Sequence, residues 1–399
     1  MSTTSASDAR RVRLFGSLCA LVFLVNFGRV VFAPLVAPLQ ADFLATDAAV
    51  GLVATLAWLG SALPRLPTGW LLTRVDRHHV VLGTGALLAV SSAGMTFAPS
   101  IEFVMVGAFL VGLASGVYFV AANPLISELF PERVGRVVGV HGTASQLAAA
   151  LAPVLVGRVL LAFYSWRAPF YLLSAAAVVV TVVIYVLAGR TDLPEAGAAD
   201  RDLLGAIRRQ YRIVVLGVVI VGVAGLVWNG FFNFYIKYLT ETKNIPSSTA
   251  ETLLTVVFAA GVPAFWYTGR LADRFRHVPL MLAVLGGFIA SLLAMTLVDG
   301  VVGVAAVSVV LGYAVHSLFP AIDTFLLDSL PDSDRASAYA GYSSVMMVVQ
   351  AMGSVVIGSL VGAGFAYDGV FQVAGVALAA LLVVLVVLYR GGRLPAGAS

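Results

Sequence analysis

TGRLADR at residues 268–274 and TGWLLTR at residues 68–74 are two versions of one short motif, placed 200 positions apart. A second pair stands at the same offset, with ELFPE at residues 128–132 and DSLPD at residues 328–332. Two matches at one offset are hard to obtain by chance in segments this short. The sequence therefore predicts that the chain consists of two similar halves.

The segments between these motifs are apolar enough to cross a membrane. Of 399 residues, 60% are hydrophobic and 11% are charged, whereas soluble domains have about 45–50% apolar and about 25% charged residues. A helix that crosses the hydrocarbon core needs about 20 apolar residues. Twelve stretches of that kind lie at residues 15–39, 50–72, 80–98, 103–125, 137–162, 168–187, 213–239, 253–271, 278–297, 301–327, 336–362 and 370–389. We therefore predict an all-α membrane protein with twelve transmembrane helices.

The charged residues predict the domains and the orientation. The most polar long segment separates six apolar stretches from six, so we expect an N-terminal six-helix bundle at 1–189, a linker at 190–212 and a C-terminal bundle at 213–399. Arginines gather before the first stretch, in the linker and after the second, fourth and eighth stretches. Because positive loop charges stay in the cytoplasm, we expect both termini and the linker there. The chain is thus predicted to be a monomeric, multi-pass protein of the cell membrane, surrounded by the lipid bilayer.

The second-half motif resembles a known family signature. Gly269–Arg274 is similar to the G-x-L-a-D-R-x-G-R motif of the major facilitator superfamily. The first-half copy, Gly69–Arg77, departs from it, with Thr73 in place of the acidic residue and Asp76 in place of the later glycine. The resemblance covers the whole chain. It implies two pseudo-symmetric six-helix bundles that transport a solute by alternating access.

The charges of the two motif copies are expected to close the cytoplasmic side. A carboxylate at a helix end can accept hydrogen bonds from a neighbouring helix N-terminus, and arginines bridge to carboxylates on facing helices. We expect Asp273 to face the start of the fifth helix near Arg136. Arg74 and Arg77 are expected to face Asp328 or Glu128. The predicted gate consists of Asp273, Arg274, Arg74, Arg77, Glu128, Asp328 and Arg136. In the alternative hypothesis these charges only set the membrane topology.

Arg29 is the clearest charge at membrane depth. It stands about 14 residues into the first apolar stretch, or roughly 20 Å along a helix, and charges at such depth usually face a cavity. Asn26 lies one turn earlier on the same face. A guanidinium there suits a carboxylate, phosphate or other oxyanion, and its position is similar to that of an arginine in organophosphate and organic-anion porters of the superfamily. Alternatively, Arg29 pairs with Asp323 or another acid.

Further polar residues at membrane depth are candidates for substrate contact. Arg65 is similar in position to an anion-binding arginine of nitrate/nitrite porters, but the second arginine of that clamp is Phe265 here. Alternatively, Arg65 takes part in gating, or its side chain snorkels to the membrane–water interface. The amides Asn229 and Asn233 share a helix face, where helix-to-helix hydrogen bonding is the alternative. The predicted substrate residues are Arg29, Asn26, Arg65, Asn229, Asn233, Gln146 and Gln350.

Two titratable residues in the tenth stretch could carry a coupling proton. His316 stands near its middle, and Asp323 lies about two turns further along. Histidine titrates near neutral pH, and burial can bring an aspartate towards that range. For His316 the alternative is a purely structural histidine.

These observations favour one function and leave two alternatives. The chain has no phosphate-binding Walker loop, metal-ligand spacing or nucleophile arrangement, so we predict no enzyme, cofactor, metal site or nucleic-acid partner. The leading hypothesis is secondary active transport of a small anionic solute, coupled to protons. One alternative is proton-driven efflux of drugs or hydrophobic compounds with Asp323 as the membrane acid, although Ala108 replaces an arginine often seen in the fourth helix. The other is a non-transporting membrane sensor.

Overall fold

The computed structural model describes residues 2–72, 74–131, 134–191, 193, 203–272 and 275–394, and these residues form helices without a strand. Within them, twelve segments are long and apolar enough to span a membrane. They are Ala9–Val30, Asp47–Leu71, Arg77–Thr96, Ile101–Leu129, Arg136–Phe163, Ala168–Ala188, Tyr211–Glu241, Ser247–Phe265, His277–Leu297, Gly300–Leu326, Ser337–Gly362 and Tyr367–Arg390. Each overlaps a predicted stretch, so the prediction of a twelve-helix, all-α membrane protein is confirmed.

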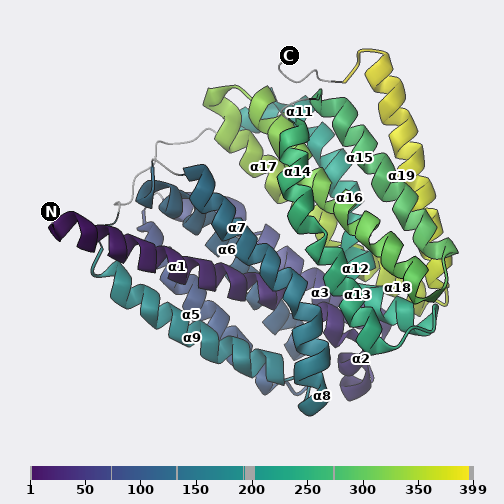
Figure 1. Cartoon of the computed structure of the whole chain (residues 1–399), viewed down its shortest axis with the longest axis horizontal. Coiled ribbons are helices and arrows are strands. Elements are labelled where there is room, and N and C mark those ends of the chain that lie inside the picture. The colour runs from purple at the N-terminus through teal and green to yellow at the C-terminus, as the bar shows by residue number, and fades with distance from the viewer. Residues whose placement is uncertain are drawn as a thin grey trace. The chain divides into compact units, whose positions relative to one another are not determined.

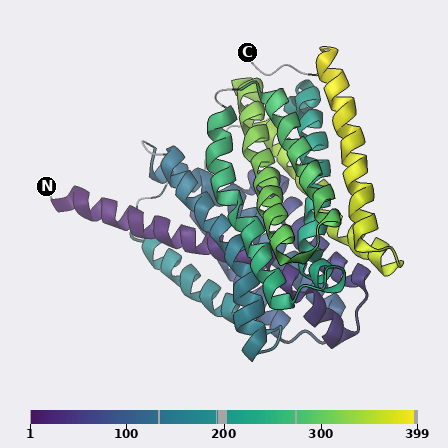
Figure 2. The ribbon, with the colours of Figure 1, turned by 45° about the vertical axis from the view of Figure 1, so that its right-hand side comes forward.

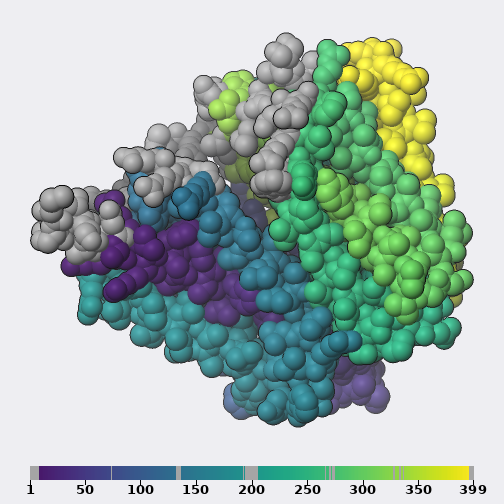
Figure 3. Space-filling view, in the orientation of Figure 1, coloured from purple at the N-terminus to yellow at the C-terminus, as the bar shows by residue number. Residues whose placement is uncertain are grey.

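Unit 1 contains residues 1–35 and 56–200. Its complete helices are α1 (Ser2–Val30), α4 (Arg65–Leu71), α5 (Arg77–Thr96), α6 (Ile101–Leu129), α7 (Val134–Val154), the π-helix η1 (Leu155–Leu160), α8 (Leu161–Phe163) and α9 (Ala168–Ala188). Helix α1 packs against α6, α7 and α9, and α5 packs against α6 and α9 (Figure 1). On the face of unit 1 seen in Figure 3, the purple surface of α1 lies beside the teal surface of α9.

Unit 2 contains residues 36–55 and 201–399. Its complete helices are α10 (Leu203–Arg209), α11 (Tyr211–Gly217), the π-helix η2 (Val218–Gly222), α12 (Val223–Glu241), α13 (Ser247–Ala259), α14 (Gly261–Ala272), α15 (His277–Leu297), α16 (Gly300–Ser329), α17 (Asp332–Ala351), α18 (Gly353–Gly362) and α19 (Tyr367–Arg390). Helix α15 packs against α16 and α19, while α12 packs against α13, α17 and α18. Figure 2 shows the yellow helix α19 along one edge of this unit.

Prolines divide several spans into two helices. The first apolar stretch, predicted as one element at 15–39, ends as α1 at Val30 and resumes as α2 (Phe32–Phe43). Pro34 explains this difference, because a proline ring clashes with the carbonyl four residues earlier, here that of Val30. Pro64 similarly lies at the break between α3 (Asp47–Ala62) and α4, and Pro263 lies in the first turn of α14, just after its break from α13.

Helix α3 is shared by the two units, because residues 47–55 cluster with unit 2 and residues 56–62 with unit 1. In unit 2, glycines bring this segment against α18. A Cβ added to Gly51 would overlap the carbonyl oxygen of Ser354, and one added to Gly358 would overlap that of Asp47. Thr55 Oγ1 accepts a hydrogen bond from the backbone N–H of Val355 at 3.0 Å. Only glycine allows two helix backbones to approach so closely.

An ion pair fixes the other end of the same segment. Lys237 on α12 donates to Asp47, and both side chains are mostly buried. Gln40 Nε2 also donates to Asp47 Oδ1, at 3.0 Å. A segment from the first half of the sequence therefore completes the packing of unit 2. The proposed division into bundles at residues 190–212 stays a prediction.

Candidate functional site

Arg29 is held in place by hydrogen bonds on the last turn of α1. Its Nη2 donates to Asn26 Oδ1 at 2.5 Å, and its Nη1 lies 3.4 Å from Ser61 Oγ on α3. Asn26 Nδ2 donates to the carbonyl oxygen of Ser145 on α7 at 2.7 Å. A carbonyl can only accept, so the amide nitrogen of Asn26 must face Ser145 and its oxygen must face Arg29. Residues of α1, α3 and α7 that lie in unit 1 thus fix the orientation of the guanidinium.

Aromatic rings surround the same guanidinium, and no carboxylate of the described part of unit 1 pairs with it. The Arg29 Cζ lies 4.3 Å from the ring centre of Trp58 and 5.8 Å from that of Phe119. Its Nε is buried without a hydrogen-bond partner. Guanidinium has five N–H donors and is always charged, so this half-buried group keeps donors and a net charge for a ligand.

Arg65 contacts the same serine. It is the first residue of α4, and its Nε donates to the carbonyl oxygen of Ser61 at 3.3 Å. Ser61 itself is completely buried. The two arginines predicted separately from the sequence are therefore brought to one residue. Gln146 is half-buried on α7, next to Ser145.

Sequence reasoning missed the residues that orient Arg29. Trp58 and Ser61 are spaced three residues apart on α3, which places them on one helix face. That spacing could have indicated that this helix face lies at membrane depth together with Arg29. Phe119 has no comparable signal, because it stands in a continuous apolar stretch.

A hydrogen-bonded pair connects α6, α7 and α1 near this region. Tyr118 Oη donates its only proton to the carbonyl oxygen of Leu18 at 2.6 Å. His141 Nε2 lies 3.0 Å from the same phenol oxygen, and it must therefore be the donor in that contact. Both side chains are buried. This network stabilises helix packing beside the Arg29 environment.

The predicted amides of unit 2 bond mainly to protein groups. Asn233 Nδ2 donates to the backbone oxygen of Asn229 at 2.9 Å and to Ser354 Oγ at 3.0 Å. Ser354 Oγ donates in turn to Asn229 Oδ1 at 2.8 Å. Gln350 Nε2 donates to the carbonyl oxygen of Val221 at 3.2 Å. These side chains are buried, and their role in substrate binding stays a prediction.

The two residues predicted to carry a proton lie in different environments of α16. Asp323 is half-buried and accepts a hydrogen bond from the phenol of Tyr339 on α17 at 2.9 Å. His316 is buried, and its Nδ1 donates to the carbonyl oxygen of Gly312 at 2.7 Å. The rings of Trp228 and Phe258 lie 5.6 Å and 5.9 Å from the His316 ring. Asp323 is thus the more open of the two.

The predicted gate is only partly described. Arg77 Nη2 on α5 pairs with Glu128 Oε1 on α6 at 3.0 Å. The guanidinium of Arg74 lies 4.1 Å from the ring centre of Trp70, and Arg136 is exposed on α7. Three predicted gate residues cannot be placed in this way: Asp273 and Arg274 lie outside the described residues, and of Asp328 only the backbone, in α16, is described.

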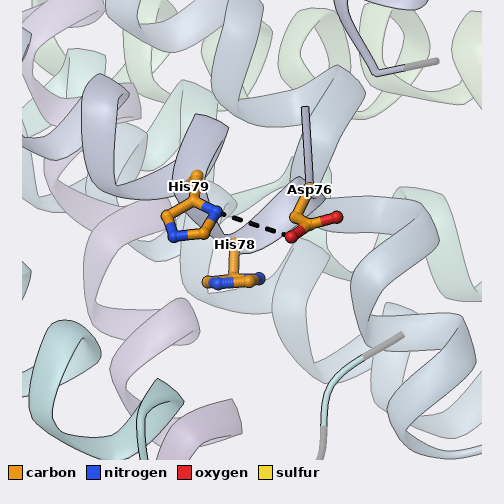
Figure 4. Close-up of side chains that lie close together, drawn as sticks. All are labelled: Asp76, His78 and His79. Atoms are coloured by element: carbon orange, nitrogen blue, oxygen red, sulfur yellow. Dashed lines mark ion pairs between the residues drawn. The ribbon is translucent and has the colours of Figure 1, made fainter. Parts of the chain in front are cut away.

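Asp76, His78 and His79 lie close together at the start of α5 (Figure 4). Their ligand atoms are within 4.8 Å of one another, and His79 Nδ1 lies 3.6 Å from Asp76 Oδ2. Nitrogen and carboxylate ligands suit zinc-like ions. However, the positive end of the α5 dipole and the neighbouring arginines disfavour a further cation here. We therefore keep the prediction that the chain has no metal site.

Comparisons with known proteins agree with this architecture. The family model "Major Facilitator Superfamily" matches residues 18–238 and 217–398. The arabinose-proton symporter of Escherichia coli (strain K12) is 29% identical over 193 residues, 47% of this chain and 40% of the symporter. The chain thus spans less than half of that relative's length. The "Probable sugar efflux transporter" of Mannheimia succiniciproducens is 22% identical over 328 residues, 81% of each protein.

Solved structures of transporters share the fold. A bacterial homolog of the human lysosomal transporter Spinster, inward-facing and occupied, has a TM-score of 0.77 and 17% identity, with 96% of this chain and 97% of that chain covered. The D-xylose-proton symporter has a TM-score of 0.75 and 14% identity, with 93% and 96% covered. At these identities the likeness establishes the fold alone.

Proposed function

The chain belongs to the Major Facilitator Superfamily, and on that premise we propose that it transports a small anionic solute by alternating access, coupled to protons. Members of this family are membrane transporters rather than enzymes. The observation that carries the proposal is the guanidinium of Arg29, which no carboxylate of the described part of unit 1 neutralises. A permanent charge at membrane depth is expensive and usually serves a function.

The surroundings of Arg29 favour an oxyanion as the ligand. Asn26 and Trp58 hold the guanidinium in one orientation before a ligand arrives, and such preorganisation lowers the entropy lost on binding. The planar fork of arginine matches carboxylate and phosphate geometry. A bound anion would neutralise the charge and satisfy the free donors. The names of two relatives mention sugars, so sugar acids and sugar phosphates are the first solutes to try.

Asp323 supports the proposal of proton coupling. It is an acid within the span Gly300–Leu326, and it accepts a hydrogen bond from the phenol of Tyr339. Acids at membrane depth often belong to proton relays. Two relatives are named as proton symporters. We infer the same coupling here, with Asp323 rather than the aromatic-packed His316 as the leading proton carrier.

Binding to purified protein tests the anionic solute. Gluconate should raise the melting temperature of the wild-type protein, because a ligand stabilises the state that it binds, whereas glucose should not. Arg29→Ala should remove the gluconate effect, and Arg29→Lys should weaken it, since lysine keeps the charge but loses the fork. Arg158→Ala is a matched control, because Arg158 is an exposed arginine on η1. Full gluconate binding by a stable Arg29→Ala protein would refute the proposal.

We also propose that both termini and the segment 190–212 face the cytoplasm, from the arginine bias of the loops. A Cys19→Ser background removes the single cysteine, so a cysteine introduced at Asp200 can be labelled selectively. An impermeant reagent should label it in inverted membrane vesicles and leave it unlabelled in intact cells. Labelling from outside intact cells would reverse the proposed orientation.

A further inference from the structure

A buried phenol in unit 2 lies beside Asp323. Tyr342 on α17 is only 1% exposed, and its hydroxyl oxygen has no hydrogen-bond partner among the described residues. A Cβ added to Gly217 at the end of α11 would overlap the Tyr342 ring, so close packing holds the ring in place. The negative charge of Asp323 acts on this phenol. Burying a polar group without a partner costs free energy, so this hydroxyl requires an explanation.

Two neighbouring phenols on one face of α17 differ in their contact with Asp323. Tyr339 and Tyr342 are three residues apart, a spacing that places side chains on the same helix face, and their ring centres are 5.8 Å apart. Tyr339 donates a hydrogen bond to Asp323 Oδ1 at 2.9 Å. In the part of the chain that the structure describes, that bond is the only one to the Asp323 carboxylate. Its Oδ2 is therefore left for a proton.

No other titratable group with a described side chain bonds to Asp323. Besides α17, the helices packed against α16 are α11, α12, α13, α14 and α15, together with the π-helix η2. The charged or titratable groups described on these helices are Tyr211, Arg212, Tyr235, Lys237, Tyr238, Glu241, Glu251, Tyr267 and His277. On α16 itself, His316 bonds to the carbonyl oxygen of Gly312. The phenols of Tyr339 and Tyr342 are thus the described groups that act on the carboxyl of Asp323.

A carboxyl group needs different partners in its two protonation states. When it is ionised it only accepts hydrogen bonds, whereas the protonated acid has an O–H group to donate. Tyr339 supplies a donor, which serves the ionised form. The protonated form needs an acceptor for its O–H group, and a phenol oxygen can accept while it keeps its own proton.

We propose that Tyr342 is a positioning residue whose hydroxyl oxygen accepts a hydrogen bond from protonated Asp323. This inference rests on the proposed proton coupling and names the residue that stabilises the proton-bound state. A proton from water adds to Asp323 Oδ2, so that an O–H bond of hydronium breaks as the carboxyl O–H bond forms, and release reverses the step. Tyr339 favours the ionised carboxylate and Tyr342 favours the protonated acid.

Infrared spectra of the purified full-length protein over a pH series measure this protonation directly. The carboxylic-acid C=O band that is missing in Asp323→Asn belongs to Asp323. In Tyr342→Phe the midpoint of this band should move to lower pH by about one unit or less, because the protonated acid loses its acceptor. The C=O stretching frequency should also rise, because the O–H group no longer donates.

Two further variants serve as controls. Tyr339→Phe should move the same midpoint to higher pH, because the ionised form loses its donor. Tyr313→Phe, about 15 Å earlier along α16, should leave the midpoint unchanged. Tyr342→Phe keeps the ring that packs against Gly217, so its melting temperature should stay close to that of the wild type.

The outcomes separate this inference from the proposed coupling. An unchanged midpoint in Tyr342→Phe, or a shift in the same direction as in Tyr339→Phe, would overturn the role of Tyr342 and leave Asp323 as the proton carrier. A pH series without any band that depends on Asp323 would overturn proton coupling at this residue and the inference with it.

Discussion

Arg29 in α1 and Asn229 in α12 occupy the same position in the two halves of the sequence, 200 residues apart. The amide of Asn229 is buried and bonded to Ser354 and Asn233. Each residue has one buried donor without a partner, Nδ2 of Asn229 and Nε of Arg29, but only the half-buried Arg29 carries a charge. The same register thus carries a neutral packing contact in unit 2 and, in unit 1, a charge that no carboxylate of the described part of that unit pairs with.

The lysines of unit 2 extend the comparison. Lys237 pairs with Asp47, and Lys243 lies 3.5 Å from both Asp299 and Asp368. Both lysines are therefore neutralised where they stand. Each of these lysines is matched by a protein acid, whereas Arg29 has no such acid in the described part of unit 1. This difference directs attention to Arg29.

Exchanging the two residues should produce the largest effect. Asn229→Arg places a bulky cation in the packed interior of unit 2, where Gly230 and Gly353 are in close backbone contact. An unpaired buried charge of this kind costs several kcal/mol, so little folded protein should be recovered in size-exclusion chromatography. Arg29→Asn should be recovered at wild-type yield. Normal yield and melting temperature for Asn229→Arg would break the comparison.

Removing a lysine from unit 2 should have the next largest effect. Lys237→Met leaves Asp47 without its cation and should destabilise the protein by about 2 kcal/mol, less than the about 3–5 kcal/mol of a fully buried pair. Adding Asp47→Asn should restore most of the melting temperature. Arg29→Met combined with Asp323→Asn should show no such rescue. A rescue there would instead support the alternative in which Arg29 pairs with Asp323.

Substitutions in the two copies of the loop motif should change the transport rate by different amounts, and both effects should be smaller than those above. We expect Asp273→Asn to slow transport in proteoliposomes by the loss of a contact worth about 1–3 kcal/mol, with little change in substrate affinity. Arg77→Gln breaks the partly exposed pair with Glu128 and should change the rate less, by about 1 kcal/mol or below. Reduced affinity with an unchanged maximal rate in Asp273→Asn would argue against a gate.

The smallest effect is expected where α10 packs against α17. Hydrogen bonds from Arg209 and Gln210 lower the pKa of Asp334. A carboxylate with a lowered pKa stabilises the folded state above its unfolded value of about 3.9, and this contribution disappears as the pH falls through the lowered value. Melting curves should therefore show a slightly weaker acid sensitivity for Asp334→Asn below about pH 4. Identical acid profiles would mean that this contact contributes nothing measurable.

The sequence was informative where a periodic or compositional pattern exists. The twelve spans follow from apolar length, and the neighbourhood of Arg29 and Asn26 follows from their spacing of one turn. The break at Val31 could have been predicted from Pro34. The contact of Arg29 with Trp58 and Ser61 joins two helices, and no pattern within one helix determines which residue of another it meets. The fit of Gly51 against Ser354 is equally invisible, because small residues suit many partners.

The division of α3 between the two units has a consequence for the order of synthesis. Residues 47–55 emerge from the ribosome early, but Val355, which bonds to Thr55, follows 300 residues later. During this interval Asp47 lacks its ion-pair partner Lys237, and Gly51 lacks its contact with Ser354. Two polypeptides made from a gene cut within 190–212 would each be incomplete: the first would carry α3 without α18, and the second would carry Lys237 without Asp47. The contact between α3 and α18 can therefore form only after residue 355 has been synthesised.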